Sequence, residues 1–463
     1  MKSEVMEHVR KVKTGEVDLE SFVEEVAKKT YEIQRKYSPF ITIPKIKIPE
    51  KKGRLFGIPI SIKDNICTKG IQTTAGSKIL QGYIPPFNAT VVERILEEGA
   101  FILGKTAMDE FGFGTFTTNC AYVIPKNPYD PERTCGGSSG GAGCITAAAD
   151  FPHIAIAEST GGSISCPAAF TGTVGLTPTY GRVSRWGLID YANSLDRIGC
   201  IGKSVCDVAL LLSVIAGPDD YDSTVLNLPP EDFTKYCVED IKGIKIGVPK
   251  EYFSEGVDER IKKLVWEQIK LLESYGASYE EISLPHTEYA LPAYYIIATA
   301  EASTNLAKFC GLRYGLHKEL KGNFDDYFSS VRTEGFGEEA KRRIILGTFA
   351  RIAGFREAYY VKALKVRSKI IEEFKSAFKK FDVLISPTMP ILPPKFTEIQ
   401  NLSPVEVYMT DILTVAPSLA GVPMMSVPIG FIENLPVGMH LIADHLQEGK
   451  LIQVAYTFEQ VKK

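Results

Sequence analysis

Apolar positions along the chain follow a helical period in some segments and a strand-like pattern in others. In residues 17–37 the apolar side chains fall on one helical face: Leu19, Phe22, Val23, Val26, Ala27 and Tyr31. Helices are also predicted over residues 90–99, 258–276 and 357–381. Short apolar runs predict strands within residues 54–66, 101–103, 153–160, 243–253, 381–390, 424–431 and 436–445.

Strands separated by helices predict an α/β protein with a mixed, largely parallel sheet covered by helices. We expect one large domain over residues 1–463. Within it, N-terminal helices occupy about residues 1–45, and a proline-rich connector over residues 41–53 follows them. Residues from about 220 to 380 are rich in long charged helices and are expected to form a helical insertion or lobe.

The composition is that of an ordinary globular protein, with 44% hydrophobic and 24% charged residues among 463. A net charge of −3 gives no general reason to bind nucleic acid or an anionic membrane. No basic domain or aromatic platform is evident, so this chain is not expected to bind nucleic acid itself. The charged N-terminus has no signal-peptide core, and no run approaches roughly 18 apolar residues, so we expect a cytoplasmic protein.

Nine cysteines are scattered without a C-x-x-C pair or a Cys/His cluster at zinc spacing. They predict reduced, mostly buried thiols and no metal site. Cys166 follows Ser163 by three residues but has no nearby base in the sequence, so a packing role is expected.

The segment AESTGGSISCPAAF, residues 157–170, places a serine directly after two glycines. Gly161 and Gly162 allow a tight turn with accessible backbone N–H groups, which makes Ser163 a candidate nucleophile. A serine hydroxyl needs a base to take its proton. The chain has only six histidines, and His153, on the predicted preceding strand, is the one near in sequence.

A second glycine- and serine-rich segment, CGGSSGGAGC, holds a formal G-x-S-x-G around Ser138. The proline-containing approach is not a strand, which argues against a nucleophile elbow. A phosphate-binding P-loop is less supported still, since no Gly-Lys-Ser/Thr follows. The simplest alternative is a turn that opens a helix, with Ser138 or Ser139 at the N-cap.

Lys63 ends the apolar strand in FGIPISIKDNI. Such a lysine commonly reaches solvent. If it is instead buried among polar partners, burial favours the neutral amine, which can act as a base. Serine–lysine pairs replace serine–histidine pairs in some enzymes, and one further serine could carry the proton between Lys63 and Ser163.

Together, GIPISIKDNI, GGSSGGAG and STGGSISCPAAFTGTVGLTPTYGRVSRWGL resemble the amidase signature family, and the resemblance continues through NSLDRIG. Its members hydrolyse amides with a Ser–cis-Ser–Lys triad. The resemblance implies the amidase signature fold, with Ser163 as nucleophile, Ser138 as the bridging serine on a cis peptide, and Lys63 as base. The backbone N–H groups of the turn that begins with Thr160, Gly161 and Gly162 would form the oxyanion hole.

The chain departs from the family motif SDTGGSIR, since it has ESTGGSIS. Ser159 replaces an aspartate and Ser165 replaces an arginine. We expect a hydroxyl pair to replace a supporting ion pair, with the local charge balance kept. One more residue than usual also separates Ser138 from Ser163.

Four further stretches, residues 178–196, 291–315, 334–349 and 407–423, resemble one branch of the family, the A subunit of a tRNA-dependent amidotransferase. In that branch the subunit hydrolyses glutamine to glutamate and ammonia. A B subunit then uses ATP and Mg²⁺ to amidate glutamate charged on tRNA(Gln), and a small C subunit wraps the pair. The resemblance implies that this chain needs no cofactor of its own and meets Glu-tRNA(Gln) through the B subunit.

Recognition of glutamine requires an acid for its α-ammonium and a base for its α-carboxylate. By motif match the acid is Asp411 and the base is Arg343, and Tyr294 adds a hydroxyl. Two alternatives stay open from the residues alone. Arg343 could be a solvated helix charge beside Lys341 and Arg342, and Asp411 could cap the following helix.

Three other functions are weighed against this one. A free-standing amidase would act on a small amide without partners and without the Asp411–Arg343 pair. A catalytically inactive scaffold subunit is disfavoured by the complete Lys63, Ser138 and Ser163 set. Nucleic-acid binding is disfavoured by the charge.

Overall fold

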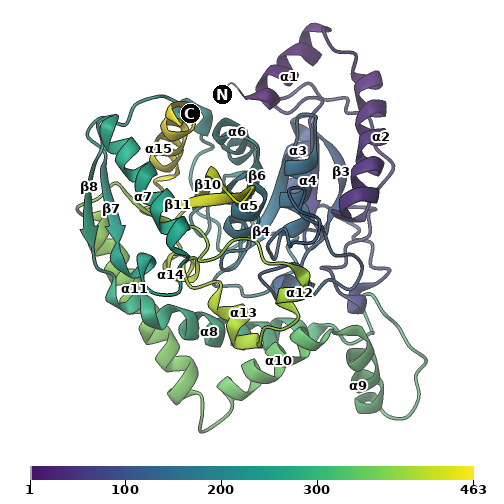
Figure 1. Ribbon diagram of the computed structural model, residues 1–463. Helices are drawn as coiled ribbons and strands as arrows, with labels where there is room; N and C mark the ends of the chain where they lie inside the picture. Colours follow the sequence, from purple (N-terminus) through teal and green to yellow (C-terminus); the bar gives the residue numbers. More distant parts are fainter. Residues whose placement is uncertain (1–2, 463) are drawn as a thin grey trace.

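In the computed structural model, which describes residues 3–462, eleven strands form one sheet in the order β1-β3-β2-β4-β6-β5-β10-β11-β9-β7-β8 (Figure 1). The strands are β1 (Phe40–Thr42), β2 (Pro59–Lys63), β3 (Phe101–Thr106), β4 (Ile154–Ser159), β5 (Val174–Thr177), β6 (Arg197–Gly202), β7 (Lys245–Pro249), β8 (Ser278–Ile282), β9 (Val383–Pro387), β10 (Met424–Ile432) and β11 (Leu435–Ala443).

Helices surround this sheet (Figure 1). They are α1 (Glu4–Thr14), α2 (Leu19–Tyr37), α3 (Thr90–Glu97), α4 (Gly140–Ala148), α5 (Ser165–Thr171), α6 (Val205–Ile215), α7 (Glu259–Ser274), α8 (Ala290–Asn305), α9 (Phe324–Gly335), α10 (Glu338–Arg351), α11 (Lys362–Phe378), α12 (Phe396–Ile399), α13 (Pro404–Met409), α14 (Val415–Ala420) and α15 (Glu448–Val461). No helix within residues 3–462 is long and apolar enough to cross a membrane.

The mixed α/β fold is confirmed, but the sheet is less parallel than expected. Parallel pairing is confined to β2 with β3 and β4, and to β7 with β8 and β9. The other neighbouring pairs are antiparallel. In the middle of the sheet β5 and β6 pair antiparallel and β10 and β11 form a hairpin, so every neighbouring pair from β4 to β9 is antiparallel.

The segment from about 220 to 380 differs from the expected helical insertion. β7 and β8 lie within it, and they extend the sheet at one edge (Figure 1). Only its later part, α8 to α11, is mainly helical. The predicted N-terminal helices correspond to α1 and α2, which are capped by the side chains of Ser3 and Asp18.

Two fully buried parallel strands, β2 and β4, position the residues around Lys63. β2 and β4 pair with Ile62 opposite Ile156, and every residue of both strands is buried. Because parallel strands end at the same edge of a sheet, the last residues of β2 and β4 meet there. Those residues are Lys63 on β2 and Glu158 and Ser159 on β4.

Candidate active site

Lys63 lies entirely inside the protein, with no exposed surface. Its Nζ is 2.8 Å from the Ser138 Oγ, 2.8 Å from the Glu158 backbone oxygen and 2.9 Å from the Glu158 Oε2. The alternative in which Lys63 reaches solvent is therefore wrong. The structure brings Lys63 and Ser138 into direct contact, and it adds a carboxylate that the sequence did not lead us to expect.

Ser138 lies in the turn that opens α4, and its peptide bond to Gly137 is cis. A Cβ on Gly137 would lie 2.4 Å from the Asp109 Oδ2 and 2.7 Å from the backbone nitrogen of Phe116, so the turn requires glycine there. Ser139 occupies the N-cap position without a side-chain cap, and its hydroxyl donates to the Glu158 backbone oxygen at 3.1 Å. The Ser138 hydroxyl contacts Lys63, so it does not serve the helix cap.

The turn from Thr160 to Ser163 connects β4 to α5, and Ser163 is 7% exposed. A Cβ on Gly161 would lie 2.9 Å from the Tyr294 hydroxyl, and one on Gly162 would lie 2.4 Å from the Thr414 Oγ1. Larger residues are thus excluded at both positions, and the turn packs directly against α8 and the start of α14. The roles of Ser163 as nucleophile and of the Thr160, Gly161 and Gly162 amides as oxyanion hole stay predictions.

The two serines that depart from the family motif, Ser159 and Ser165, do not form a hydrogen bond with each other. The Ser159 hydroxyl donates to the Gly161 backbone oxygen at 2.7 Å, whereas the Ser165 hydroxyl lies 3.4 Å from the His440 Nε2. The expected hydroxyl pair is therefore wrong. The Ser159 hydroxyl instead bonds to the Gly161 backbone oxygen within the turn from Thr160 to Ser163, and that oxygen also accepts the Ser418 hydroxyl at 2.8 Å. The acid in this part of the chain is the preceding residue, Glu158.

Two buried histidines lie near these elements, but burial makes both poor bases. Burial lowers the pKa of His153 and of His440 to about 3. His153 contacts the Ser61 hydroxyl at 3.0 Å, and His440 is the ring beside Ser165. The lysine–serine arrangement is thus the one that offers a route for a proton.

Asp411, half-buried between α13 and α14, is held by two hydroxyls. Its carboxylate accepts from the Tyr295 hydroxyl at 2.7 Å and from the Thr115 hydroxyl at 3.1 Å. Burial raises the pKa of this carboxyl. The helix-cap alternative is wrong, because α14 begins at Val415 with Thr414 at its N-cap.

Arg343 is 2% exposed on α10, so the solvated-charge alternative is also wrong. Its Nε donates to the Glu339 Oε1 at 2.8 Å, and its Nη1 donates to the Tyr191 hydroxyl at 2.6 Å. The guanidinium also lies over the ring of Tyr295, 5.2 Å from its centroid. The acid and the base predicted for glutamine therefore contact the same aromatic residue, Asp411 at its hydroxyl and Arg343 at its ring.

That residue, Tyr295, was missed by the sequence reasoning, which selected its neighbour. Tyr294 packs against Gly161 in the turn from Thr160 to Ser163. Tyr295 contacts the acid and the base. Because adjacent residues of a helix point in different directions, the pair in AYYII was itself a signal that two separate contacts were being made.

A pocket of about 760 Å³ opens onto this cluster and is lined by Thr115, Glu339, Arg343 and Tyr408 among others. The backbone oxygen of Thr115 lies 3.5 Å from the Cys166 thiol at the start of α5. Thr115 therefore connects the pocket to the elements that carry Ser163. Cys166 is buried, as a packing residue should be, and burial raises the pKa of its thiol.

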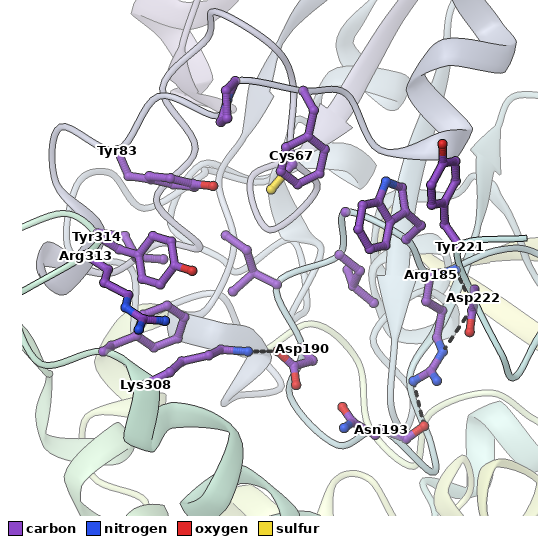
Figure 2. A pocket seen from close by; sticks show the side chains of 18 residues that line it. Cys67, Tyr83, Arg185, Asp190, Asn193, Tyr221, Asp222, Lys308, Arg313 and Tyr314 are labelled. Carbon is purple, nitrogen blue, oxygen red and sulfur yellow. Dashed lines mark hydrogen bonds and ion pairs between the residues drawn. The ribbon is translucent and has the colours of Figure 1, made fainter.

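A second pocket, of about 880 Å³, is lined by none of the predicted site residues (Figure 2). It carries the exposed rings of Phe87, Trp186 and Tyr221 in a row, with centroids 5.6 Å and 5.1 Å apart. The expectation of no aromatic platform is therefore wrong, because the fold joins rings from distant segments. Two of the pocket's three cations are paired with acids, Lys308 with Asp190 and Arg185 with Asp222, and Arg313 is the third.

Nothing in residues 3–462 resembles a metal centre, since no group of three or more His, Cys, Asp or Glu side chains is arranged to hold an ion. All nine cysteines are free, and six of them are buried. The expectation that the thiols are mostly buried is confirmed.

Comparison with known proteins places the chain in a family. The Amidase family model matches residues 5–452. The A subunit of glutamyl-tRNA(Gln) amidotransferase from Thermoanaerobacter pseudethanolicus is 52% identical over 88% of this chain and 83% of its own length. The protein of the same name from Carboxydothermus hydrogenoformans is 49% identical over 94% of this chain and 93% of its own length.

Solved structures agree with these sequence matches. The crystal structure of the glutamyl-tRNA(Gln) amidotransferase A subunit from Thermotoga maritima superposes with a TM-score of 0.81 at 37% identity, covering 96% of this chain and 94% of its own. Peptide amidase from Stenotrophomonas maltophilia gives a TM-score of 0.79 at 26% identity, covering 100% and 97%. With its buried lysine against a serine on a cis peptide, and with this likeness over nearly its whole length, the chain belongs to the amidase family.

Proposed function

We propose that this chain is the glutamine-hydrolysing A subunit of a glutamyl-tRNA(Gln) amidotransferase, which supplies ammonia for the conversion of Glu-tRNA(Gln) to Gln-tRNA(Gln). The relatives that carry this name, at about half identity over most of the chain, support the assignment. The single structural observation that supports amide hydrolysis best is the 2.8 Å contact between the Lys63 Nζ and the Ser138 Oγ.

The proposed chemistry is acyl transfer. A neutral Lys63 accepts the proton of Ser138, which in turn accepts the proton of Ser163. The Ser163 Oγ attacks the side-chain amide carbon of glutamine, and the backbone N–H groups of the Thr160–Ser163 turn stabilise the oxyanion. The C–N bond then breaks, and ammonia leaves with a proton returned through Ser138. Water cleaves the glutamyl ester and regenerates Ser163.

Asp411 and Arg343 supply the recognition of glutamine in this proposal. Asp411 binds the α-ammonium, and Arg343, whose guanidinium lies over the Tyr295 ring, binds the α-carboxylate. Arg343 already donates to Glu339, which fixes the direction of the guanidinium and leaves its other N–H groups for a ligand. Tyr294 adds its hydroxyl beside the nucleophile turn.

The partners and location are proposed on the same grounds. B and C subunits complete a cytoplasmic heterotrimer, the B subunit binds the charged tRNA, and the complex consumes ATP with Mg²⁺. This chain is proposed to hold no cofactor itself. The relatives' names support an amidotransferase assembly but give no number of subunits.

The experiment that tests the assignment is a comparison of the chain purified alone with the chain co-purified from its native cell. We expect glutamine-dependent amidation of Glu-tRNA(Gln) only when the co-purifying proteins are present. Rapid turnover of small amides by the chain alone, with no partner recovered, would instead favour a free-standing amidase.

Asp411→Asn is expected to raise the KM for glutamine about 10- to 100-fold with a smaller change in kcat. The carboxylate binds the substrate ammonium equally in the ground state and the transition state, so its loss removes uniform binding. Steady-state kinetics with glutamine and with an amide that lacks an α-amino group provide the test. If the simple amide suffers as much as glutamine, Asp411 is structural.

The affinity for glutamine is expected to fall as the solution becomes more acidic. Burial raises the pKa of Asp411 above the ordinary aspartate value, so this carboxyl is protonated at a higher pH than an exposed one. A protonated carboxyl cannot pair with the α-ammonium. The KM for glutamine should therefore rise as the pH falls through that pKa in the wild type, and Asp411→Asn should abolish this rise. A KM that is independent of pH in the wild type would contradict the assigned role.

A further inference from the structure

The Lys63 amine has a third partner that the proposed mechanism does not use. The Glu158 carboxylate, 1% exposed, lies 2.9 Å from the Lys63 Nζ through its Oε2, and the same oxygen accepts the Asn65 side-chain amide at 3.0 Å. Within residues 3–462 this is the one ion pair of Lys63, and both partners are withdrawn from water. A carboxylate at this distance favours the ammonium over the neutral amine.

Counting donors and acceptors shows what this contact does. The Nζ has three partners, namely the Ser138 Oγ, the Glu158 backbone oxygen and the Glu158 Oε2, and each of them can accept. An ammonium has three N–H donors and no lone pair, so it satisfies all three acceptors and cannot take a proton from Ser138. A neutral amine donates to the two Glu158 oxygens and turns its lone pair toward Ser138.

We propose that Glu158 holds Lys63 as an ammonium in the resting enzyme and thereby sets the pH above which the amidase works. The inference rests on the proposed function, in which Lys63 is the base. One N–H bond of the ammonium breaks and its proton passes to water, which leaves the lone pair facing the Ser138 Oγ. Only then can the proton of Ser163 move through Ser138 to Lys63.

Other buried ionisable groups lie in this region of the fold, among them Asp64, the residue after Lys63, which pairs with Lys105 at 3.6 Å. Asp109 contacts backbone amides at Thr117 and Asn119, and burial raises its pKa to about 6. The Asp196 carboxylate accepts hydrogen bonds from the backbone N–H groups of Tyr191 and Ala192, and burial raises the pKa of this carboxyl too. Burial lowers the pKa of Arg197 to about 9, and its guanidinium donates to the Pro178 and Val422 oxygens and to Ser418. The charge of Asp109 interacts with that of Lys63 and the charge of Asp196 with that of Glu158, but Glu158 is the carboxylate in direct contact with the Lys63 Nζ.

The motif comparison supplies a useful variant. The family pattern SDTGGSIR has serine at the position of Glu158, so Glu158→Ser introduces a residue that the family's fold already accommodates. Glu158→Gln keeps the length of the side chain and an oxygen that accepts from Lys63, but it removes the negative charge. The two variants thus remove the same charge with different effects on packing.

The test is the pH profile of kcat/KM in the protein as isolated with its partners, with glutamine and with a simple amide as substrates. The acidic limb of this profile is the range in which kcat/KM rises with pH. We expect Glu158→Gln and Glu158→Ser to move this limb to lower pH by about one unit or more. The plateau value of kcat/KM at high pH should be largely kept. A shift of one unit makes the variants about tenfold faster than the wild type on the acidic limb. Glu459→Gln is the control, because Glu459 is also buried and titrates, with a pKa raised to about 7 by burial, but contacts Val205 on α6.

Two results would overturn the proposal. An acidic limb that stays in place in both folded variants would show that Glu158 does not control the protonation of Lys63. Loss of activity at every pH in both folded variants would show that Glu158 positions Lys63 instead. If the wild type hydrolyses the simple amide but not glutamine, the proposed function is contradicted. The proposal about Glu158 is then still tested, because the acidic limb of the pH profile can be measured with the simple amide.

Discussion

Replacement of Ser163 with alanine is expected to lower glutamine hydrolysis and glutamine-dependent amidation by roughly 10⁴- to 10⁶-fold. Without its hydroxyl no acyl-enzyme can form, and what remains is the effect of binding and of the turn's N–H groups. Amidation fed with free ammonium should continue in the assembled enzyme, because that step is proposed to occur in another subunit. Both activities are measured on the same preparation.

Ser165→Ala is the matched control. Ser165 lies two residues after Ser163, and its hydroxyl is 3.4 Å from the His440 Nε2, outside the proposed proton path. We expect it to retain most of the glutaminase activity. If Ser163→Ala also lost ammonium-dependent amidation while remaining folded and assembled, the serine would have a role other than acyl transfer.

Lys63→Arg is expected to be as inactive as Lys63→Ala, with a loss of about 10²- to 10⁴-fold. A guanidinium keeps the positive charge opposite Glu158 but stays protonated at any working pH, so it cannot accept the proton from Ser138. Glutaminase assays of both variants check this result. Turnover near that of the wild type in the arginine variant would remove Lys63 from the mechanism.

Folding stability should separate the two lysine variants. Lys63→Ala leaves the Glu158 carboxylate buried without its cation, which costs about 3–5 kcal/mol for a pair of this kind. Lys63→Arg retains a cation there, so we expect a smaller loss. Denaturant unfolding of the two variants and of the wild type provides the comparison. An arginine variant that is inactive but more stable than the alanine variant is the expected combination.

The candidate catalytic segments could be predicted from the sequence because their glycines and serines lie close together along the chain. Two turns have no room for a side chain, the one around Gly161 and Gly162 and the one around Gly137. Because these turns require glycine, the glycines in the sequence indicate where the turns lie. The end of β2 was also predictable, since an apolar strand that finishes in lysine has a clear boundary. The burial of Lys63 was not predictable. Whether the last residue of a strand faces solvent or a neighbouring strand depends on the order of the strands in the sheet.

Long-range contacts explain what sequence reasoning missed. Glu158 was interpreted as part of a strand, and its contact with Lys63 depends on the parallel pairing of β2 with β4. Tyr295 meets Asp411 and Arg343 only because α8, α10 and the segment before α14 converge. The antiparallel centre of the sheet likewise follows from pairings between β5, β6 and β10 that no local pattern encodes.

The most direct test of the account is to find the acylated residue. The wild-type protein is incubated with glutamine, quenched with acid during turnover and digested, and the glutamyl adduct is located by peptide mass spectrometry. The account predicts an ester on Ser163 in the wild type and no adduct in Ser163→Ala. An adduct on another side chain of this region, such as Cys166, would contradict it, as would continued hydrolysis of glutamine by Ser163→Ala.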